Sequence, residues 1–305
     1  MEMCERTDCK ICQSSEAEAI YSGDVRDGKF GSFKKAQILR CTFCGADRIE
    51  GVANLSLGDY ETDFYRNHIG QNHDVSDHHA THDHLVKFTL DAIWPQNLRN
   101  KLVGDVGCGA GALLDHLCGV TNRDLIAVEP SLSWESALVE RGYKWFSSCN
   151  DALEIYQNKL DYIFSVQVIE HVEDPRLFLA DLKALLAPEG RILISTPNRN
   201  DILMKLLPDE FSRFFYRTQH MWYFDVKSLE NCANRAGLTV DNVCFKQRYP
   251  LSNTVNWLKS KIPSGSEKIA FFDQQIDSAW RVWLEENAMA DNIYLILKHT
   301  GVEAQ

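Results

Sequence analysis

The sequence predicts an α/β protein with a doubly wound parallel sheet, a small amino-terminal module and a carboxyl-terminal cap or insertion. Three observations predict this architecture. Short apolar runs alternate with amphipathic segments between Lys101 and Asn198, a glycine-rich loop follows the first of these runs, and two cysteine pairs lie in the segment before them. A sheet of this kind binds its ligands outside the carboxyl ends of its strands.

Length and composition allow more than one folding unit. The chain has 305 residues, of which 45% are hydrophobic and 25% are charged, so it can bury a large core. Changes in pattern along the chain divide it into four parts. We expect a small module over residues 1–60, a connector or lid over 61–97, the central fold over 98–245, and cap helices with the last strand over 246–305.

The charge balance bears on the partners. The chain has 32 Lys+Arg against 43 Asp+Glu, a formal net charge of −11, and residues 1–60 are also acidic on balance. Because such a surface repels polyanions, we do not expect nucleic acid as a partner.

No run approaches the roughly 18 apolar residues of a membrane span. The polar start at Met1–Lys10 does not resemble a signal peptide, so we expect a cytoplasmic protein without a membrane span.

The amino-terminal segment contains two C-x-x-C pairs. Cys9 and Cys12 form the first, Cys41 and Cys44 form the second, and 28 residues separate the two pairs. Four thiolates complete a tetrahedral shell without water, which is typical of a structural Zn²⁺ site. Frequent glycines predict a β-rich zinc ribbon around it. The alternative, two separate redox pairs, is disfavoured because no strand–helix pattern surrounds either pair. Cys4 is close by and is treated as a spare thiol.

The elements of the central fold follow from periodicity and capping signals. Four apolar runs predict buried parallel strands, and they lie at Leu102–Val106, Leu125–Val128, Tyr162–Val168 and Ile192–Ser195. Asp174 and Pro175 predict the start of a helix, and Gly190 is expected to end it. Further on, we expect a helix near Val226–Gly237 and strands near Leu238–Phe245 and Asn292–His299, with an aromatic insertion between those strands.

The glycine-rich loop joins the first of these strands to a helix. Gly107, Gly109 and Gly111 allow close approach of a ligand, and the helix amino terminus attracts an anion. Glu129 ends the next strand, where a nucleotide-binding fold places an acid on the ribose. Asp105, just before the loop, would repel a pyrophosphate but attract a cationic amino group.

An amino acid joined to a nucleoside satisfies all of these requirements. The ligand that this chemistry describes is S-adenosylmethionine (SAM), with Glu129 on the ribose hydroxyls. Asp151, beyond the next strand, is placed where a side chain can meet the adenine amino group.

The central motifs resemble class I SAM-dependent methyltransferases, whose sheet is Rossmann-like. The resemblance covers about residues 98–245 and rests on residues 105–111, 128–131, 168–175 and 186–191. It is closest to the branch of ubiquinone-pathway O-methyltransferases and bacterial small-molecule or glycan methyltransferases. The resemblance implies SAM contacts at Asp105, Gly107, Gly109, Glu129 and Asp151, with Gln167 beside the methionine end.

The flanking segments resemble parts of sugar-modifying relatives. The cysteine pairs resemble the zinc module of deoxysugar C-methyltransferases and of methyltransferases found with polysaccharide biosynthesis, and residues 248–258 resemble a segment of the latter. The resemblance implies a small-molecule acceptor, a hydroxyl or carbon of a nucleotide-linked or glycan sugar. Three rivals remain: a zinc-ribbon RNA methyltransferase, a non-catalytic adaptor with the same fold, and a nicotinamide oxidoreductase. The oligomeric state is not indicated.

Two histidines are candidates for the base that would deprotonate an acceptor hydroxyl. His171 follows the third of the apolar runs above at the ligand-binding edge, and His220 lies in an aromatic segment expected near the acceptor. Alternatively, His171 only braces its loop. Glu170 is interpreted as structural.

Aromatic residues are expected on either side of the central motifs. Tyr60, Phe64 and Tyr65 are expected to form a lid, or else to pack between modules. The aromatic cluster over residues 211–224 is expected to line a pocket or to form a core.

Histidines are concentrated just before the central fold. Six of the ten lie within 17 residues, at His68, His73, His78, His79, His82 and His84. If this stretch is helical, His78 and His82 share a face at the spacing of a metal-binding pair. The alternative is a solvated connector without a ligand.

Overall fold

The structure is a computed structural model that describes residues 8–28, 31–53, 57–62, 64–70, 74–93, 97–265 and 267–301. Cys4 and His73 lie outside the described residues, so their predicted roles are not addressed. Across the described ranges, none of the helices has the length and apolar character needed to cross a membrane.

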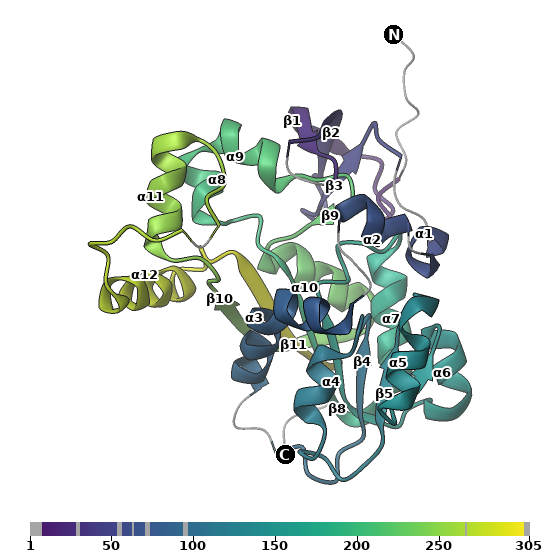
Figure 1. Cartoon of the computed structure of the whole chain (residues 1–305). Helices are drawn as coiled ribbons and strands as arrows, with labels where there is room; N and C mark the ends of the chain where they lie inside the picture. The colour runs from purple at the N-terminus through teal and green to yellow at the C-terminus, as the bar shows by residue number, and fades with distance from the viewer. Residues whose placement is uncertain are drawn as a thin grey trace.

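The centre of the molecule is a seven-stranded sheet (Figure 1). Its strand order is β10-β11-β8-β7-β4-β5-β6. The strands are β4 (Val103–Val106), β5 (Leu125–Val128), β6 (Lys144–Phe146), β7 (Leu160–Val166), β8 (Leu186–Pro197), β10 (Leu238–Lys246) and β11 (Asn292–His299). The five strands from β8 to β6 are parallel, and β11 is antiparallel to both its neighbours. The doubly wound α/β sheet is thus confirmed, and its order reverses between β4 and β7, where such sheets bind ligands.

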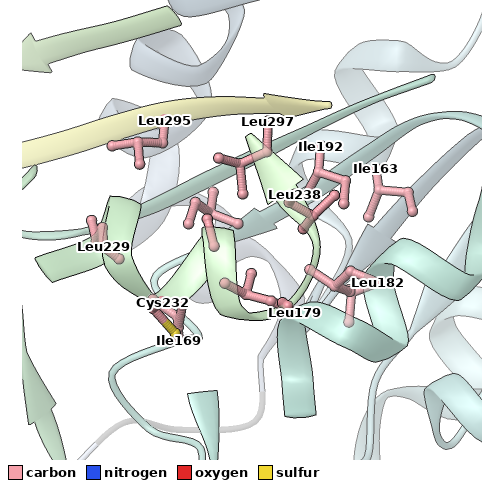
Figure 2. Packing of buried hydrophobic residues seen from close by; sticks show 14 of the residues in the cluster. Ile163, Ile169, Leu179, Leu182, Ile192, Leu229, Cys232, Leu238, Leu295 and Leu297 are labelled. Atoms are coloured by element: carbon pink, nitrogen blue, oxygen red, sulfur yellow. The ribbon is translucent and has the colours of Figure 1, made fainter. Parts of the chain in front are cut away.

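Helices cover both faces of this sheet because alternate strand residues point to opposite sides. Ile163 and Ile192 belong to one buried cluster, while their neighbours Phe164 and Leu193 belong to the other. The first face is covered by α7 (Pro175–Leu185) and α10 (Val226–Arg235), whose leucines meet the strands in Figure 2. Residues of α3 (Val75–Ile93), α4 (Ala112–Leu117) and α5 (Glu135–Glu140) pack in the second cluster. The short α6 (Cys149–Tyr156) packs beside α7.

Helix α7 begins as predicted but ends earlier. The Asp174 carboxylate accepts the Leu177 N–H at 2.9 Å, as an N-cap does. The expectation that Gly190 ends the helix is wrong, because the helix ends at Leu185 and Gly190 lies within β8. Opposite Leu160 and Tyr162 the β8 register shifts, and a Cβ at Gly190 would lie 2.9 Å from the Leu160 carbonyl oxygen. The lack of a side chain at Gly190 therefore allows β7 and β8 to approach each other closely.

The amino-terminal segment forms a second, antiparallel sheet in the order β1-β2-β3-β9. Its strands are β1 (Ala17–Arg26), β2 (Phe33–Cys41), β3 (Asp47–Glu50) and β9 (Trp222–Tyr223). The fourth strand comes from a distant part of the chain, so the amino-terminal sheet is completed by the central fold. Arg199 reinforces this junction: its Nη1 lies 2.8 Å from Asp47, which Arg40 also pairs with at 2.7 Å.

The remaining helices complete the molecule. They are α1 (Leu57–Glu61), α2 (Phe64–Ile69), α8 (Ile202–Leu206), α9 (Pro208–Phe215), α11 (Leu251–Ser260) and α12 (Gln274–Glu286). In Figure 1, α11 and α12 lie at one side of the molecule, and α12 contacts β10. The predicted aromatic insertion is therefore helical. Phe211, Phe215 and Trp257 are buried in one cluster with amino-terminal residues, so part of the aromatic segment forms core.

Candidate functional site

One cleft of about 1750 Å³ unites most of the predicted site residues. It lies at the carboxyl ends of β4, β5 and β7. Eight predicted donor-side or base residues line it, namely Asp105, Gly107, Gly109, Glu129, Asp151, Gln167, His171 and His220. Gly111 and the four cysteines are not among the lining residues. The sequence therefore predicted one connected site and one separate cysteine cluster.

The glycine loop requires its glycines for different contacts. Gly107, Gly109 and Gly111 all have positive φ, at 77°, 54° and 78°. A Cβ at Gly107 would lie 2.4 Å from Val168, and one at Gly109 would lie 2.6 Å from the His78 Nε2. At Gly111 it would meet Leu138 of α5 at 2.8 Å. Gly111 thus allows helix packing behind the loop, whereas Gly107 and Gly109 border the cleft.

Two buried acids lie beside this loop. The Glu129 Oε2 accepts the Gly109 N–H at 2.7 Å and its Oε1 accepts the Ser131 N–H at 3.0 Å. These bonds fix the carboxylate at the end of β5. Asp105 is 4% exposed, and burial together with the nearby Glu129 charge raises the pKa of Asp105 to about 8. A cationic group at this position would favour the ionised carboxylate.

The histidine-dense segment covers the loop. It is helical, since α3 contains His78, His79 and His82. His79 Nε2 is 3.1 Å from the Ala110 oxygen, and the His78 and His82 rings stack with centroids 4.1 Å apart. Burial lowers the pKa of His78 to about 2. Within the ranges that the structure describes, the side-chain groups that can hold a metal ion do not include this pair.

Asp151 and Gln167 border the cleft on either side of the loop. The Asp151 Oδ2 accepts from Ser147 Oγ at 2.5 Å and from Ser148 Oγ at 2.8 Å at the start of α6, and these two hydroxyl bonds lower the Asp151 pKa. Gln167 has a φ of 58°, and its amide donates to Ser195 Oγ at 3.3 Å and to Asn292 Oδ1 at 3.2 Å. The fold thus holds Asp151 in the first turn of α6 and Gln167 just after the end of β7.

The two candidate bases are in contact. The rings of His171 and His220 meet edge to face, with centroids 4.6 Å apart. His171 Nδ1 is 2.8 Å from the Gln219 carbonyl oxygen and 3.0 Å from the Tyr60 hydroxyl. Because a carbonyl oxygen only accepts, Nδ1 carries the proton and Nε2 is left with its lone pair. Burial lowers the pKa of His171 to about 4, so the ring is neutral at physiological pH.

Glu170 lies next to this histidine pair. Its Oε2 accepts from Thr196 Oγ1 at 3.0 Å, whereas its buried Oε1 has no hydrogen-bond partner and lies 4.0 Å from the His171 Nε2. Burial raises the pKa of Glu170 to about 7. Ligand atoms of Glu170, His171 and His220 lie within 4.8 Å of one another, close enough to hold a metal ion. Sequence reasoning took Glu170 as structural and missed this free oxygen.

The four cysteines meet between the amino-terminal sheet and α10. Sγ atoms of Cys9 and Cys44 are 3.6 Å apart, those of Cys12 and Cys41 are 3.4 Å apart, and all four lie within 4.8 Å of one another. A tetrahedral Zn²⁺ with Zn–S bonds of about 2.3 Å separates its sulfurs by about 3.8 Å. The geometry of the cluster therefore fits a four-thiolate zinc ion.

Two cleft residues were not anticipated from the sequence. Arg26, at the end of β1, and Arg217, after α9, both line the cleft. They form an isolated parallel bridge, with the Arg26 N–H donating to Tyr216 at 3.0 Å and the Thr218 N–H donating to the Arg26 oxygen at 2.9 Å. The two residues are far apart in the chain, and no local motif indicates their pairing.

Comparisons with known proteins identify relatives of the central fold. A family model described as "Methyltransferase domain" matches residues 77–243. The ubiquinone biosynthesis O-methyltransferase of Haemophilus ducreyi is 29% identical over 175 residues, which are 48% of this chain and 72% of that protein. The tRNA U34 carboxymethyltransferase of Campylobacter jejuni is 26% identical over 161 residues, 50% of this chain and 54% of that protein.

Other matches cover less of the relative. Further ubiquinone biosynthesis O-methyltransferases are matched over 49% to 63% of their length, so the chain spans about half to two thirds of many relatives. Among solved structures, a SAM-dependent methyltransferase from Thermotoga maritima aligns with a TM-score of 0.48 at 15% identity, over 73% of this chain and 95% of that chain.

Proposed function

Because this chain belongs to the class I SAM-dependent methyltransferases, we propose that it methylates a hydroxyl or carbon of a nucleotide-linked or glycan sugar. The observation that carries this proposal is the single cleft in which the glycine loop, the two buried acids and a histidine pair meet. Donor and acceptor can therefore be held next to each other in one cleft.

We assign the donor to the loop side of the cleft. Asp105 would receive the amino group of the SAM methionine, and Glu129 would receive the ribose hydroxyls. Gly107 and Gly109 would let the donor approach the backbone, and Asp151 would lie near the adenine. Bound SAM supplies the methyl group, and the protein's own residues orient the donor and exclude water.

We assign proton removal to His171, paired with Glu170. The lone pair of His171 Nε2 is available to an acceptor hydroxyl, and Tyr60 and Gln219 hold the ring through Nδ1. An ionised Glu170 would stabilise the imidazolium that forms. Since the Glu170 pKa is about 7, we expect kcat at saturating SAM to rise as the pH increases through 7. In Glu170→Gln this rise should disappear.

The base assignment is tested by substitution. His171→Asn should lower kcat by about 10²- to 10⁴-fold, the usual contribution of a general base, with the Kd for SAM unchanged. His116→Asn, an exposed histidine on α4, is the control and should retain full activity. Equal kcat values for the two variants would leave His171 with a bracing role only, and the same measurement on His220→Asn would then test the second candidate.

The amino-terminal module is proposed to hold structural zinc. Cys9, Cys12, Cys41 and Cys44 would be the ligands, and a closed tetrahedral shell would leave no position for catalysis. Its contribution would be to stabilise the sheet that carries Arg26.

The acceptor class is tested by a turnover screen. The protein would be incubated with SAM and with uridine and thymidine diphosphate sugars, a catechol, and unmodified tRNA, and S-adenosylhomocysteine release would be measured. Turnover with a nucleotide sugar is the expected result. Turnover with the catechol alone would overturn the sugar assignment.

Transfer to tRNA is the second candidate, because some relatives are tRNA U34 carboxymethyltransferases. The net charge of −11 disfavours it. Release of S-adenosylhomocysteine with tRNA alone, falling steeply with salt, would establish it.

A further inference from the structure

The cleft contains two arginines that form no ion pair within the described residues, although the nearby Glu170 carboxyl acts on the Arg217 charge. Among the residues that the structure describes, neither Arg26 nor Arg217 has a carboxylate within ion-pair distance, and the Nε of each is buried without a hydrogen-bond partner. The acids nearest along the chain are engaged elsewhere: Asp27 pairs with Lys34 at 2.9 Å, and Asp24 pairs with Lys35 at 2.8 Å. Unpaired buried charge is costly, so its presence indicates a ligand.

The fold holds these two cations in place. The Arg26 guanidinium lies over the Phe214 ring at 4.6 Å from its centroid. The Arg217 backbone is bound twice by Tyr223, whose hydroxyl accepts the Arg217 N–H at 2.8 Å and donates to the Arg217 carbonyl oxygen at 2.9 Å. The backbone bridge therefore holds the two arginines as neighbours. Burial, together with the Arg217 charge, lowers the pKa of Arg26 to about 9, and burial lowers the pKa of Arg217.

The pair lies on the acceptor side of the cleft. The His220 N–H donates to the Arg217 carbonyl oxygen at 3.1 Å, and the His171 Nδ1 lies 2.8 Å from the carbonyl oxygen of Gln219 on the same loop. The loop side has a different arginine, because Arg66 Nη2 would lie 3.8 Å from a Cβ at Gly109. Arg66 is therefore the arginine that we expect to meet a carboxylate of the donor. Arg248 lines the mouth of the same cleft and is exposed.

We propose that Arg26 and Arg217 bind a phosphoryl group of the methyl acceptor. Two guanidinium groups match a multiply charged oxyanion better than a single carboxylate, and each can donate two parallel hydrogen bonds to phosphate oxygens. This inference deepens the proposed function and rests on it, because the diphosphate of a nucleotide-linked sugar supplies such a group. The acidic surface as a whole favours a small ligand that enters the cleft over a polymer that covers the surface.

Inorganic pyrophosphate is the direct probe. It would be titrated calorimetrically into the full-length protein saturated with S-adenosylhomocysteine, with malonate as the carboxylate counterpart. We expect pyrophosphate to bind to the wild type. The variants Arg217→Gln and Arg26→Gln should each weaken pyrophosphate binding at least tenfold, while the affinity for S-adenosylhomocysteine stays unchanged. Arg213→Gln is the matched control, because this α9 arginine is half exposed and stacks on Phe33 outside the cleft lining. It should bind pyrophosphate as the wild type does.

Stability provides a second readout. Removing an unbalanced buried charge should leave the melting temperature of Arg217→Gln equal to or above that of the wild type, and Arg217→Lys should recover part of the pyrophosphate affinity. A variant that melts lower and binds equally well would overturn the inference. Three other results would also overturn it. The arginine variants could lose S-adenosylhomocysteine binding along with pyrophosphate binding, the wild type could bind malonate more tightly than pyrophosphate, or RNA could be the only ligand that displaces pyrophosphate.

The outcome separates this inference from the sugar assignment. Pyrophosphate binding requires no turnover. If the arginine variants lose pyrophosphate but no nucleotide sugar is methylated, the phosphoryl site stands and the sugar class fails. If nucleotide sugars are methylated equally well by both arginine variants, the sugar class stands and the phosphoryl site fails.

Discussion

At the scale of single residues, the glycine loop after β4 has positions where a side chain cannot be added without a clash. Gly109 combines a φ of 54° with a contact that leaves no space for a Cβ, whereas Gly119 has a φ of 84° and no atom within 4 Å of a Cβ. Gly119→Ala should therefore cost only the backbone strain, about 1 kcal/mol of unfolding free energy. Gly109→Ala should cost more and should also lower SAM affinity at least tenfold. Urea unfolding and SAM calorimetry on both variants check this difference.

Asp105 makes a prediction about pH. Its pKa of about 8 in the unliganded protein means that the carboxyl is largely protonated at pH 6, and SAM binding must then release that proton. SAM affinity should rise with pH between 6 and 8, by at most tenfold per pH unit. Asp105→Asn should bind weakly and without this rise. A flat wild-type profile would contradict the ion pair with the donor.

The same residues show why one side of the site could be predicted and the other could not. Asp105, the glycines and Glu129 belong to two neighbouring strand ends whose order and spacing are written locally in the sequence. The acceptor side combines Tyr60, Glu170 and Arg217, and their contacts exist only because separate loops meet in space. Neither periodicity nor spacing carries information about such contacts.

At the scale of elements, the junction between the two sheets rests on one buried network. Arg199 contacts Asp47 and the α10 cap Asp225, and Asp47 is fully buried. Arg199→Ala should destabilise the protein by about 3 kcal/mol, because it removes one of the two cations that pair with the buried Asp47 and the only ion-pair partner shown for Asp225 in the described residues. Arg191→Ala, which removes a partly exposed pair with Asp241, should cost less than about 1 kcal/mol. Denaturant unfolding of both variants measures the difference.

Strands and helix starts were easier to predict than ends and strand partners. The strand Leu125–Val128 and the start of α7 are as predicted, because apolar runs and an N-cap are local signals. The predicted end of α7 was wrong, because Gly190 lies in β8 and allows a close approach to Leu160 of β7. The pairing of β3 with β9 had no local signal, because β9 is two residues long and its partner is far away in the chain.

At the scale of the whole molecule, the proposed zinc ion should stabilise the amino-terminal sheet without contributing to SAM binding. Cys41→Ser should lose the bound zinc and lower the melting temperature, while SAM still binds, because the loop side of the cleft belongs to the other sheet. Cys118→Ser, which changes an exposed cysteine, should keep both metal and stability. Elemental analysis, thermal unfolding and SAM calorimetry on the two variants test this. Zinc retained at full stoichiometry in Cys41→Ser would refute the proposed ligand set.

The shared strand β9 also limits how this enzyme can be recombined. In a chimera that takes residues 1–60 from another protein, the amino-terminal sheet would lack its own matching fourth strand. The bridge between Arg26 and Arg217 would also be lost, because Arg26 belongs to the replaced segment. Grafting residues 216–224 together with that segment would restore both. The segments that would have to be exchanged together are therefore far apart in the sequence, although they are adjacent in space.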